Sequence, residues 1–599
     1  MTTIPARADI PKQATWNHES VFASFADWRA EYSAVSSQLG QFTAFQGTLA
    51  ESAERLAAYF DCYQKLARRV WTLYMYTAMW QACDGENEDI KGMLGQAQGL
   101  AGQFLSSVAF AQPELLAMDP GDLLQWTQSE PVMQQYEHYI DDLLRKKQHV
   151  LSAEIESALG LLNDPLGRIE SIRSALNDMD LRFDDAIDSS GAPQPLIQST
   201  RDKLLGEGDR QIRQSAWQNY ADSYLRFHNT FATAYLASVK SSVVQARLRG
   251  YESVLQAKLS PSNIPLEVFH NLIDTCRRHI PTWHRYWDVR RRALGYERIH
   301  PWDIWAPLTS DDPQVSFGEA VDMIAAGMQP LGADYVQTMR RGCMEERWVD
   351  HAINRGKSEG AFSYGTYDSH PFIMLSFDGS LGAMSTLAHE LGHSMHSYYS
   401  RRHQPFIYSN YSMFAAEVAS NFNQALVRAH LFAQDNDRAF QLALIQEAMD
   451  NIHRYFFIMP TLARFELEVH SRMENDEPLT PAALNDIMAG YFAEGYGETM
   501  TDDPRRTGIT WAQFGHLYEA FYTFQYATGI SAAHALANAI LADKSGAAVE
   551  RYLAFLRAGG SQYPIDALQK AGVGMSTPVA VEEIFTVLGG LVDRLEGLL

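Results

Sequence analysis

Apolar residues recur at three- and four-residue spacing along most of the chain, and this pattern is typical of amphipathic helices. The helical stretches are residues 20–110, 131–180 and 199–249, and then from Ser385 almost to Leu599. The first of them contains few Pro or Gly residues, which would otherwise break a helix. The pattern therefore predicts a mainly α-helical protein.

Turn-forming residues interrupt the helices near residue 195. The segment 188–195 reads DSSGAPQP, and residues 180–187, DLRFDDAI, alternate in the manner of a short strand. We place a soft boundary here, between a helical N-terminal region of residues 1–195 and a longer region of residues 196–599, which carries the candidate chemistry described below.

The helical pattern fails between Gly356 and Gly382. Gly360–Tyr367 (GAFSYGTY) alternates small and aromatic residues, and Pro371–Phe377 (PFIMLSF) is a continuous apolar run with Pro first, which suits a sheet edge or the beginning of a strand. We therefore predict two strands just before a helix that begins near Ser385, and with them a small β-sheet beside that helix.

Composition and charge narrow the class of protein. Hydrophobic residues make up 46% of the 599 residues and charged residues 20%, which excludes wholesale disorder. The formal net charge of −23 argues against nucleic acid as a partner. The chain shows neither the apolar segment of a signal peptide nor a run near the ~20 residues of a membrane span, so no membrane partner is expected.

Four cysteines occur without the CxxC spacing of a thiolate metal site: Cys62, Cys83, Cys276 and Cys343. Scattered thiols of this kind are typical of a reducing compartment, and we expect a cytoplasmic protein.

The candidate chemistry begins in residues 386–396, TLAHELGHSMH. His389 and His393 are four residues apart, so on a helix they share one face and can bind one Zn²⁺. Glu390 points about 100° away around the helix, beside the metal, where it can accept a proton from water. The alternative is a helix surface with two solvated histidines.

A catalytic zinc needs a third protein ligand. His396 and Tyr399 stand where a metzincin would have a glycine and its third histidine, which argues against that arrangement. Glu417 is the better candidate, because a carboxylate among apolar neighbours is costly to bury unless it is paired or metal-bound. An exposed or salt-bridged Glu417 is the alternative, and we interpret His396 as a packing or outer residue. The neighbours of Glu417 are small and allow two helices to approach closely: Ala415, Ala416, Ala419 and Ser420.

These residues resemble the oligoendopeptidase F family, within the thimet oligopeptidase-like zinc metallopeptidases. The matching pieces, in order, are RADIPKQATWNHESVFASFADW, PFIMLSFDG, TLAHELGHSMHSYYS, FAAEVAS and WAQFGHLYEAFYTFQYATG. The similarity extends over nearly the whole chain. It implies a two-lobed helical metallopeptidase with a deep substrate channel that admits short unstructured peptides and excludes folded proteins.

By the same resemblance, His389, His393 and Glu417 hold one Zn²⁺ per chain and Glu390 is the general base. His516, Tyr522 and Tyr526 match family residues that face the substrate carbonyl, with Tyr518 as a rival. The three tyrosines recur at a spacing of four, so they can line one face of a helix. The alternative is an aromatic packing stripe with hydroxyl groups at its edge.

Two positions depart from the usual family pattern. Gln424 stands where a Glu commonly follows the third ligand, which changes the charge around the metal. Gly515–His516–Leu517 replaces the usual Pro-His-Phe and is closer to the thimet oligopeptidase type, a change that affects specificity more than chemistry.

Two further segments are candidates for substrate contact. Tyr364 and Gly365 lie in the first predicted strand, whose edge can pair with an extended peptide; a purely structural hairpin is the alternative. The Gly-rich residues 494–499, followed by Arg505 and Arg506, either close over substrate or form an ordinary surface loop.

The sequence thus predicts a zinc-dependent endopeptidase acting on oligopeptides. A zinc exopeptidase of similar build, a peptide-binding protein without catalysis and a structural zinc site are the alternatives. The residues leave the cleavage preference, the physiological peptides and the oligomeric state open.

Overall fold

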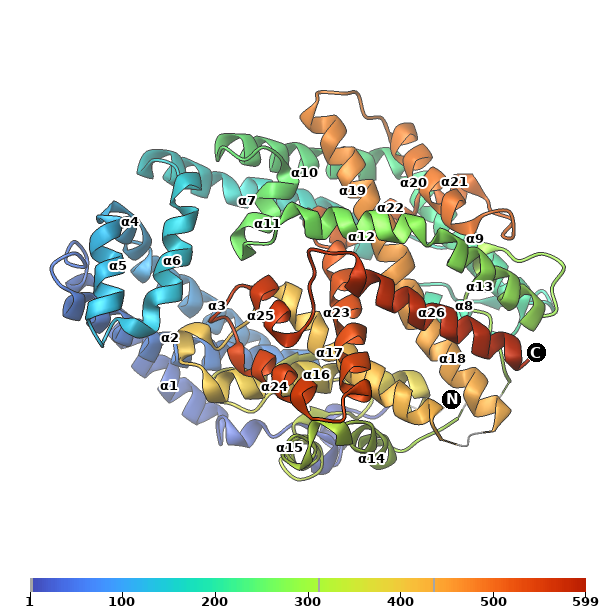
Figure 1. Cartoon of the computed structure of the whole chain (residues 1–599), viewed down its shortest axis with the longest axis horizontal. Helices are drawn as coiled ribbons and strands as arrows, with labels where there is room; N and C mark the ends of the chain where they lie inside the picture. Colours follow the sequence, from blue (N-terminus) through green and yellow to red (C-terminus); the bar gives the residue numbers. More distant parts are fainter. Residues whose placement is uncertain (1–3, 311–312, 435–436) are drawn as a thin grey trace. The chain divides into compact units, whose positions relative to one another are not determined.

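The computed structural model describes residues 4–310, 313–434 and 437–599, and most of them are helical (Figure 1). The chain divides into two compact units, each assembled from three stretches of sequence. Unit 1 consists of Met1–Val150, Gln314–Val427 and Ile540–Ala571, and unit 2 of Leu151–Pro313, Arg428–Ala539 and Gly572–Leu599. The mainly helical class with a small sheet is confirmed.

The units are not bounded at residue 195, because unit 2 begins at Leu151 and returns twice later in the chain. It stays a prediction that residues 1–195 form a helical N-terminal region and that residues 196–599 carry the chemistry. The deep substrate channel also stays a prediction. No helix among the described residues combines the length and the apolar character that a membrane crossing requires.

The helices of unit 1 come from the first, middle and last parts of the chain. They are α1 (Phe25–Gln38), α2 (Ala53–Cys83), α3 (Glu88–Val108), α4 (Ala111–Ala117), α5 (Pro120–Ser129), α6 (Glu137–Lys146), α14 (Phe317–Gly327), α15 (Ala333–Met344), α16 (Leu381–His403), α17 (Met413–Phe432), α24 (Ala547–Ala558) and α25 (Pro564–Ala571). The unit boundary at Val427 falls inside α17.

The long helix α2 organises the core of the N-terminal part of unit 1. Its first turn is capped by the Ser52 hydroxyl, which accepts a hydrogen bond from the Arg55 amide. Leu66, Val70 and Leu73 repeat at helical spacing and are all buried in one core cluster. Phe372 and Met374, which belong to the small sheet, are part of the same buried cluster.

A three-stranded sheet connects that core to the candidate site. Its strands are β3 (Val349–Asp350), β4 (Phe362–Tyr364) and β5 (Phe372–Met374), in the order β3-β5-β4. The central strand β5 is parallel to β3 and antiparallel to β4, and all three of its residues are fully buried. Both predicted strands are therefore present but shorter than expected, and β4 forms an edge of this sheet. The strand β3 is an addition that the sequence pattern did not reveal.

Unit 2 contains the remaining helices and a minimal hairpin. Its helices are α7 (Ala153–Ala175), α8 (Arg201–Leu205), α9 (Arg210–Arg226), α10 (His228–Leu248), α11 (Val254–Leu259), α12 (Leu266–Arg278), α13 (Ile280–Ala293), α18 (Arg438–His453), α19 (Met459–Glu474), α20 (Pro481–Tyr496), α21 (Pro504–Thr507), α22 (Thr510–Gln513), α23 (Phe524–Ala542) and α26 (Val579–Gly597). The boundary at Ala539 falls inside α23.

The predicted strand at 180–187 is reduced to β1 (Ala186–Ile187), which pairs with β2 (Pro193–Gln194). The turn between them is closed by the Asp188 carboxylate, whose Oδ1 accepts hydrogen bonds from the amides of Ser190 and Ala192. The loop chemistry predicted for 188–195 is thus confirmed, with two of its residues taken into the hairpin.

Candidate metal site

The helix α16 carries both histidines of the candidate site. It begins at Leu381, four residues before the predicted start, because the Ser380 hydroxyl caps it by accepting a hydrogen bond from the Ala383 amide at 3.1 Å. His389 and His393 lie in the middle of this helix and share one face, as the spacing predicts.

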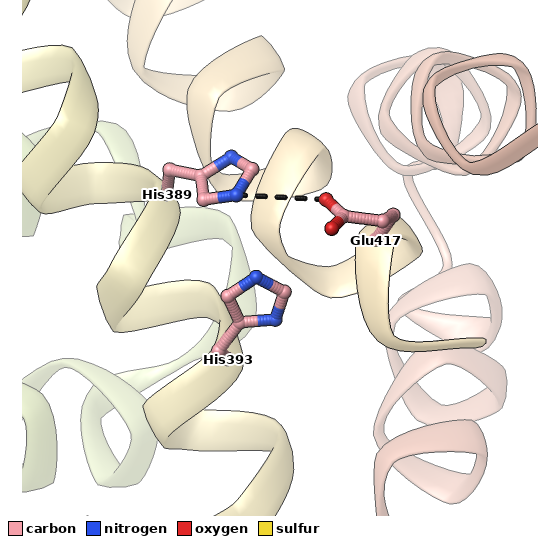
Figure 2. A group of neighbouring side chains, drawn as sticks. All are labelled: His389, His393 and Glu417. Carbon is pink, nitrogen blue, oxygen red and sulfur yellow. Dashed lines mark ion pairs between the residues drawn. The ribbon is translucent and has the colours of Figure 1, made fainter. Parts of the chain in front are cut away.

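The third member of the group comes from α17. In the part of the chain that the structure describes, His389, His393 and Glu417 each place one ligand atom within 4.8 Å of the others. Figure 2 shows the imidazole of His389 directed at the Glu417 carboxylate, and Nε2 of His389 lies 3.5 Å from Oε2 of Glu417. Two imidazoles and one carboxylate match the donor set of a catalytic zinc site, so these residues fit Zn²⁺.

The close approach of α16 and α17 depends on Gly392. An ideal β-carbon on this residue would lie 2.5 Å from the Ser420 Cα and still closer to the Ala419 carbonyl oxygen. Only glycine allows the two backbones to pack at this separation, which brings Glu417 to the histidines. The small residues around Glu417 therefore have the role in helix packing that the sequence predicts.

Gln424 determines which nitrogen of His389 carries a hydrogen. The Gln424 Oε1 lies 3.1 Å from Nδ1 of His389, and its amide nitrogen donates to the Ser385 hydroxyl at 2.8 Å. Because an amide oxygen only accepts, Nδ1 must be the protonated nitrogen, and Nε2 presents its lone pair toward Glu417. This is the orientation that a metal ligand requires, and a neutral amide achieves it in place of the usual carboxylate.

Burial disfavours the charged forms of His393 and Glu390. It lowers the pKa of His393 well below its ordinary value, with His389 and His396 adding to the effect. It raises the pKa of Glu390 to about 7, with Glu417 adding to the effect, whereas His389 and the backbone of Ser363 oppose it. Oε2 of Glu390 is buried and has no hydrogen-bond partner among the described residues.

His396 is a packing residue, as the sequence suggests. Its ring stacks on Tyr411 with centroids 3.6 Å apart and an interplanar angle of 5°. Burial lowers the pKa of its imidazole to about 3, so it stays neutral. The Tyr411 hydroxyl in turn donates to the His393 carbonyl at 3.2 Å, which ties this stack to the helix of the site.

A second predicted group assembles in unit 2. The ring of His516 stacks on Tyr522 with centroids 5.8 Å apart, and the hydroxyls of Tyr522 and Tyr526 lie 3.2 Å from each other. Burial lowers the pKa of His516, with Arg454 and Arg173 adding to the effect. This group contains one imidazole and two phenols, all of which can donate hydrogen bonds.

The expectation that the three tyrosines line one helix face is wrong. Tyr518 ends a 3₁₀ turn, Gly515–Tyr518, and α23 begins only at Phe524, so residues 519–523 are not helical. The backbone is left-handed at Phe521, whose φ is +54°. Tyr518 turns away and its hydroxyl donates to the Phe231 carbonyl at 3.5 Å, which leaves Tyr522 and Tyr526 beside His516.

Tyr364 and Gly365 are occupied by contacts within unit 1. The ring of Tyr364 packs against the N-terminal core cluster, and burial raises its pKa to about 12. A β-carbon on Gly365 would lie 2.5 Å from the His370 carbonyl oxygen and 2.8 Å from the Arg401 guanidinium. These contacts within the chain already account for a glycine at position 365. Substrate contact by Tyr364 and Gly365 stays a prediction.

The Gly-rich segment at 494–499 ends α20 and turns at Gly497, whose φ is +59°. Downstream, Arg506 pairs with Asp222 at 2.8 Å and with Asp503 at 2.7 Å. These pairs hold Arg506 within unit 2, which favours an ordinary surface loop over a cover for substrate.

Sequence reasoning missed two residues around these groups. The sequence indicates Gln424 only as a departure from the usual family pattern, because its contact with His389 forms only when α16 and α17 pack together. Glu466 gave no signal, because it lies 55 residues before its hydrogen-bond partner Phe521.

The comparisons with known proteins agree with this geometry. The family model described as Peptidase family M3 matches residues 204–587, and the model described as Oligopeptidase F matches residues 114–183. Oligopeptidase PepF of Bacillus subtilis (strain 168) is 34% identical over 597 residues, which cover 100% of this chain and 89% of the relative.

Two further relatives extend the comparison. The chromosomal oligoendopeptidase F of Lactococcus lactis subsp. cremoris is 30% identical, over 99% of this chain and 98% of its own. The crystal structure of oligoendopeptidase-F from Enterococcus faecium is similar with a TM-score of 0.75 at 28% identity, over 96% of this chain and 99% of that one. The chain therefore belongs to peptidase family M3, in its oligopeptidase F branch, and is a metallopeptidase.

Proposed function

We propose that this chain is an endopeptidase that cleaves internal bonds of short, unstructured peptides with one Zn²⁺ held by His389, His393 and Glu417. The observation that carries the proposal is the three-residue cluster on α16 and α17, together with the buried carboxyl group of Glu390 on the same helix. The relatives' names, oligopeptidase and oligoendopeptidase, support the substrate class.

A bound Zn²⁺ would supply Lewis-acid chemistry, lowering the pKa of a water toward ~7 and polarising a carbonyl group. Glu390 accepts the proton of the attacking water at its unpartnered Oε2 and delivers it to the nitrogen of the leaving amine. Burial raises the pKa of this carboxyl group, which favours its holding the proton between the two steps. Gln424 keeps His389 in the tautomer that presents Nε2.

The developing negative charge on the carbonyl oxygen calls for hydrogen-bond donors. We assign this role to His516 and Tyr522, with Tyr526 as the partner of Tyr522, from the resemblance in sequence and from the contacts within their own group. Tyr518 is the weaker candidate, because its hydroxyl is directed at a backbone carbonyl.

A direct test replaces Glu390 with Gln and assays an internally quenched peptide that is blocked at both ends, together with its unblocked counterpart. We expect wild-type protein to cut the blocked peptide, and the E390Q variant to lose about 10²–10⁴-fold in turnover while retaining its zinc, because Glu390 is not a ligand. Near wild-type turnover by E390Q would contradict the assigned base.

The same assay separates the alternatives. Cleavage of the unblocked peptide alone would identify an exopeptidase, and stoichiometric binding without products would identify a peptide-binding protein. The zinc content, measured by elemental analysis, tests the stoichiometry of one ion per chain. A cytoplasmic location stays a prediction.

A further inference from the structure

The loop between the 3₁₀ turn at 515–518 and α23 contains a strained residue. Phe521 has a φ of +54°, in the left-handed region that a bulky side chain rarely adopts. Its ring is nevertheless buried, with centroids 5.6 Å from Phe269 and 4.9 Å from His470. Strain of this kind persists only where surrounding groups hold the backbone in place.

The group that holds this backbone is Glu466 on α19. The amide of Phe521 donates to Oε1 of Glu466 at 2.8 Å, and the hydroxyl of Thr523 donates to Oε2 at 2.6 Å. Both Glu466 and Thr523 are fully buried. One carboxyl group therefore bridges the two sides of the strained residue, and no other buried carboxyl group in unit 2 is bonded to this loop among the described residues.

The bridged residues flank Tyr522. Within the loop, the amide of Tyr522 donates to the Glu519 carbonyl at 3.1 Å, and the amide of Glu519 donates to the His516 carbonyl at 3.1 Å. The turn at Phe521 thus separates Tyr518, directed at Phe231, from Tyr522, which stacks with His516. Loss of this turn would free Tyr522 to move away from His516.

We infer that Glu466 is a positioning residue, which holds the left-handed turn at Phe521 and thereby keeps Tyr522 against His516. This inference rests on the proposed function only for its catalytic consequence, because the anchoring itself is a property of the free protein. Burial raises the pKa of Glu466 to about 8. A protonated carboxyl group keeps both contacts, because one oxygen still accepts from Phe521 while the O–H donates to the Thr523 hydroxyl.

The experiment compares four variants of the full chain by hydrogen exchange, resolved to peptides covering residues 514–526. Glu466→Leu removes both hydrogen bonds, and Thr523→Val removes one. Glu466→Gln retains both, because its amide oxygen accepts from Phe521 and its NH₂ donates to Thr523. Glu468→Ala is the matched control, because Glu468 lies on the same helix, is 36% exposed and pairs only with Arg472 among the described ion pairs.

We expect exchange in 514–526 to become about tenfold faster or more in Glu466→Leu, less so in Thr523→Val, and to stay unchanged in Glu466→Gln and Glu468→Ala. Turnover of the blocked peptide should fall with little change in KM in Glu466→Leu and be restored in Glu466→Gln. Unchanged exchange in Glu466→Leu, or a Gln variant that resembles the Leu variant, would overturn the inference; should Glu466→Leu fail to fold, Thr523→Val decides alone.

Faster exchange with undiminished hydrolysis would uphold the anchor and would instead contradict the assignment of Tyr522 and His516 to the substrate. A uniform rise in exchange over all of α19 would show general destabilisation and would also overturn the inference.

Discussion

At the level of single residues, Gln424 shows how one neutral side chain can set the chemistry of a histidine. Its amide is fixed by the Ser385 hydroxyl, so its oxygen can only accept from Nδ1 of His389. Loss of a side chain that hydrogen-bonds a metal ligand typically lowers metal affinity or activity by about 10–100-fold. A carboxylate at the same position would accept equally well and add a negative charge.

We therefore expect Gln424→Ala to weaken zinc binding by about 10–100-fold and Gln424→Glu to bind at least as tightly as wild type. Competition with a metal chelator measures both. Gln434→Ala is the matched control, because Gln434 also contacts a histidine, His430, at 2.9 Å, but on the exposed surface. Equal affinities for wild type and Gln424→Ala would show that the tautomer is set by other groups.

Glu466 gives a pH dependence of stability at the same scale. Its folded-state pKa is about 8, raised from 4.5 by burial, with Glu519 adding to the effect and with Thr523, Phe521 and Lys258 opposing it. Between these two values the native chain holds a proton that the unfolded chain has lost. Stability therefore falls as pH rises from about 4.5 through about 8, by up to about 5 kcal/mol.

Glu466→Gln removes this dependence, so its Tm relative to wild type should rise between pH 5 and about pH 8 and level off by pH 9. Thermal unfolding of both proteins over that range measures the difference, in which other titrating groups cancel. Parallel Tm curves would contradict a raised pKa of Glu466.

At the level of elements, the metal cluster depends on how closely two helices pack. α16 and α17 meet at Gly392, where a β-carbon would overlap Ala419 and Ser420. Since His389 and His393 are on one helix and Glu417 on the other, any change in helix separation changes the distances within the cluster.

We expect Gly392→Ala to cost about 1–3 kcal/mol through overpacking and to lower zinc affinity as Glu417 is displaced. The control is Gly382→Ala on the same helix, where the nearest atom to a β-carbon is the Ser380 hydroxyl at 3.7 Å. That change should leave zinc affinity unchanged. Thermal unfolding and chelator competition measure the two effects, and unchanged affinity in Gly392→Ala would contradict the role of helix packing.

The connection into α23 places Tyr522 beside His516 and directs Tyr518 at Phe231. Tyr522→Phe should lower turnover of the blocked peptide by about 10²–10³-fold, the range for loss of an oxyanion donor. Tyr518→Phe should stay close to wild type, because its hydroxyl donates to the Phe231 carbonyl instead. Steady-state kinetics of the two variants measure both turnover rates. A larger loss of turnover in Tyr518→Phe than in Tyr522→Phe would favour Tyr518 as the oxyanion donor.

At the level of the whole molecule, the proposed zinc ligands belong to one compact unit. α16 lies entirely within unit 1, and Glu417 precedes the boundary at Val427. Metal binding is therefore expected to stabilise unit 1 directly.

Removal of zinc should lower the Tm, since a ligand present at a thousandfold excess over its Kd stabilises the native state by about 4 kcal/mol. Hydrogen exchange should accelerate most in 381–403 and 413–427, and zinc should restore both properties. Addition of zinc to His389→Ala serves as the control. A Tm that does not respond to chelation would contradict a bound ion at this site.

The amino-acid sequence by itself determined the helical class, the two strands before α16, and the pairing of His389 with His393. These features follow from local periodicity, because the spacing of side chains along a helix or strand is a property of the backbone. The small residues around Glu417 also predict a close helix contact, because short side chains leave room for a second backbone.

Tertiary structure alone decided the partner of His389, the left-handed turn at Phe521 and the separation of Tyr518 from Tyr522 and Tyr526. Each depends on groups far apart in sequence, as with Glu466 and the amide of Phe521, 55 residues away. A left-handed backbone at a phenylalanine is unfavourable locally and forms only because a buried carboxyl group and the surrounding packing stabilise it. No periodicity in the sequence records such a contact, because its free energy comes from burial that exists only in the folded chain.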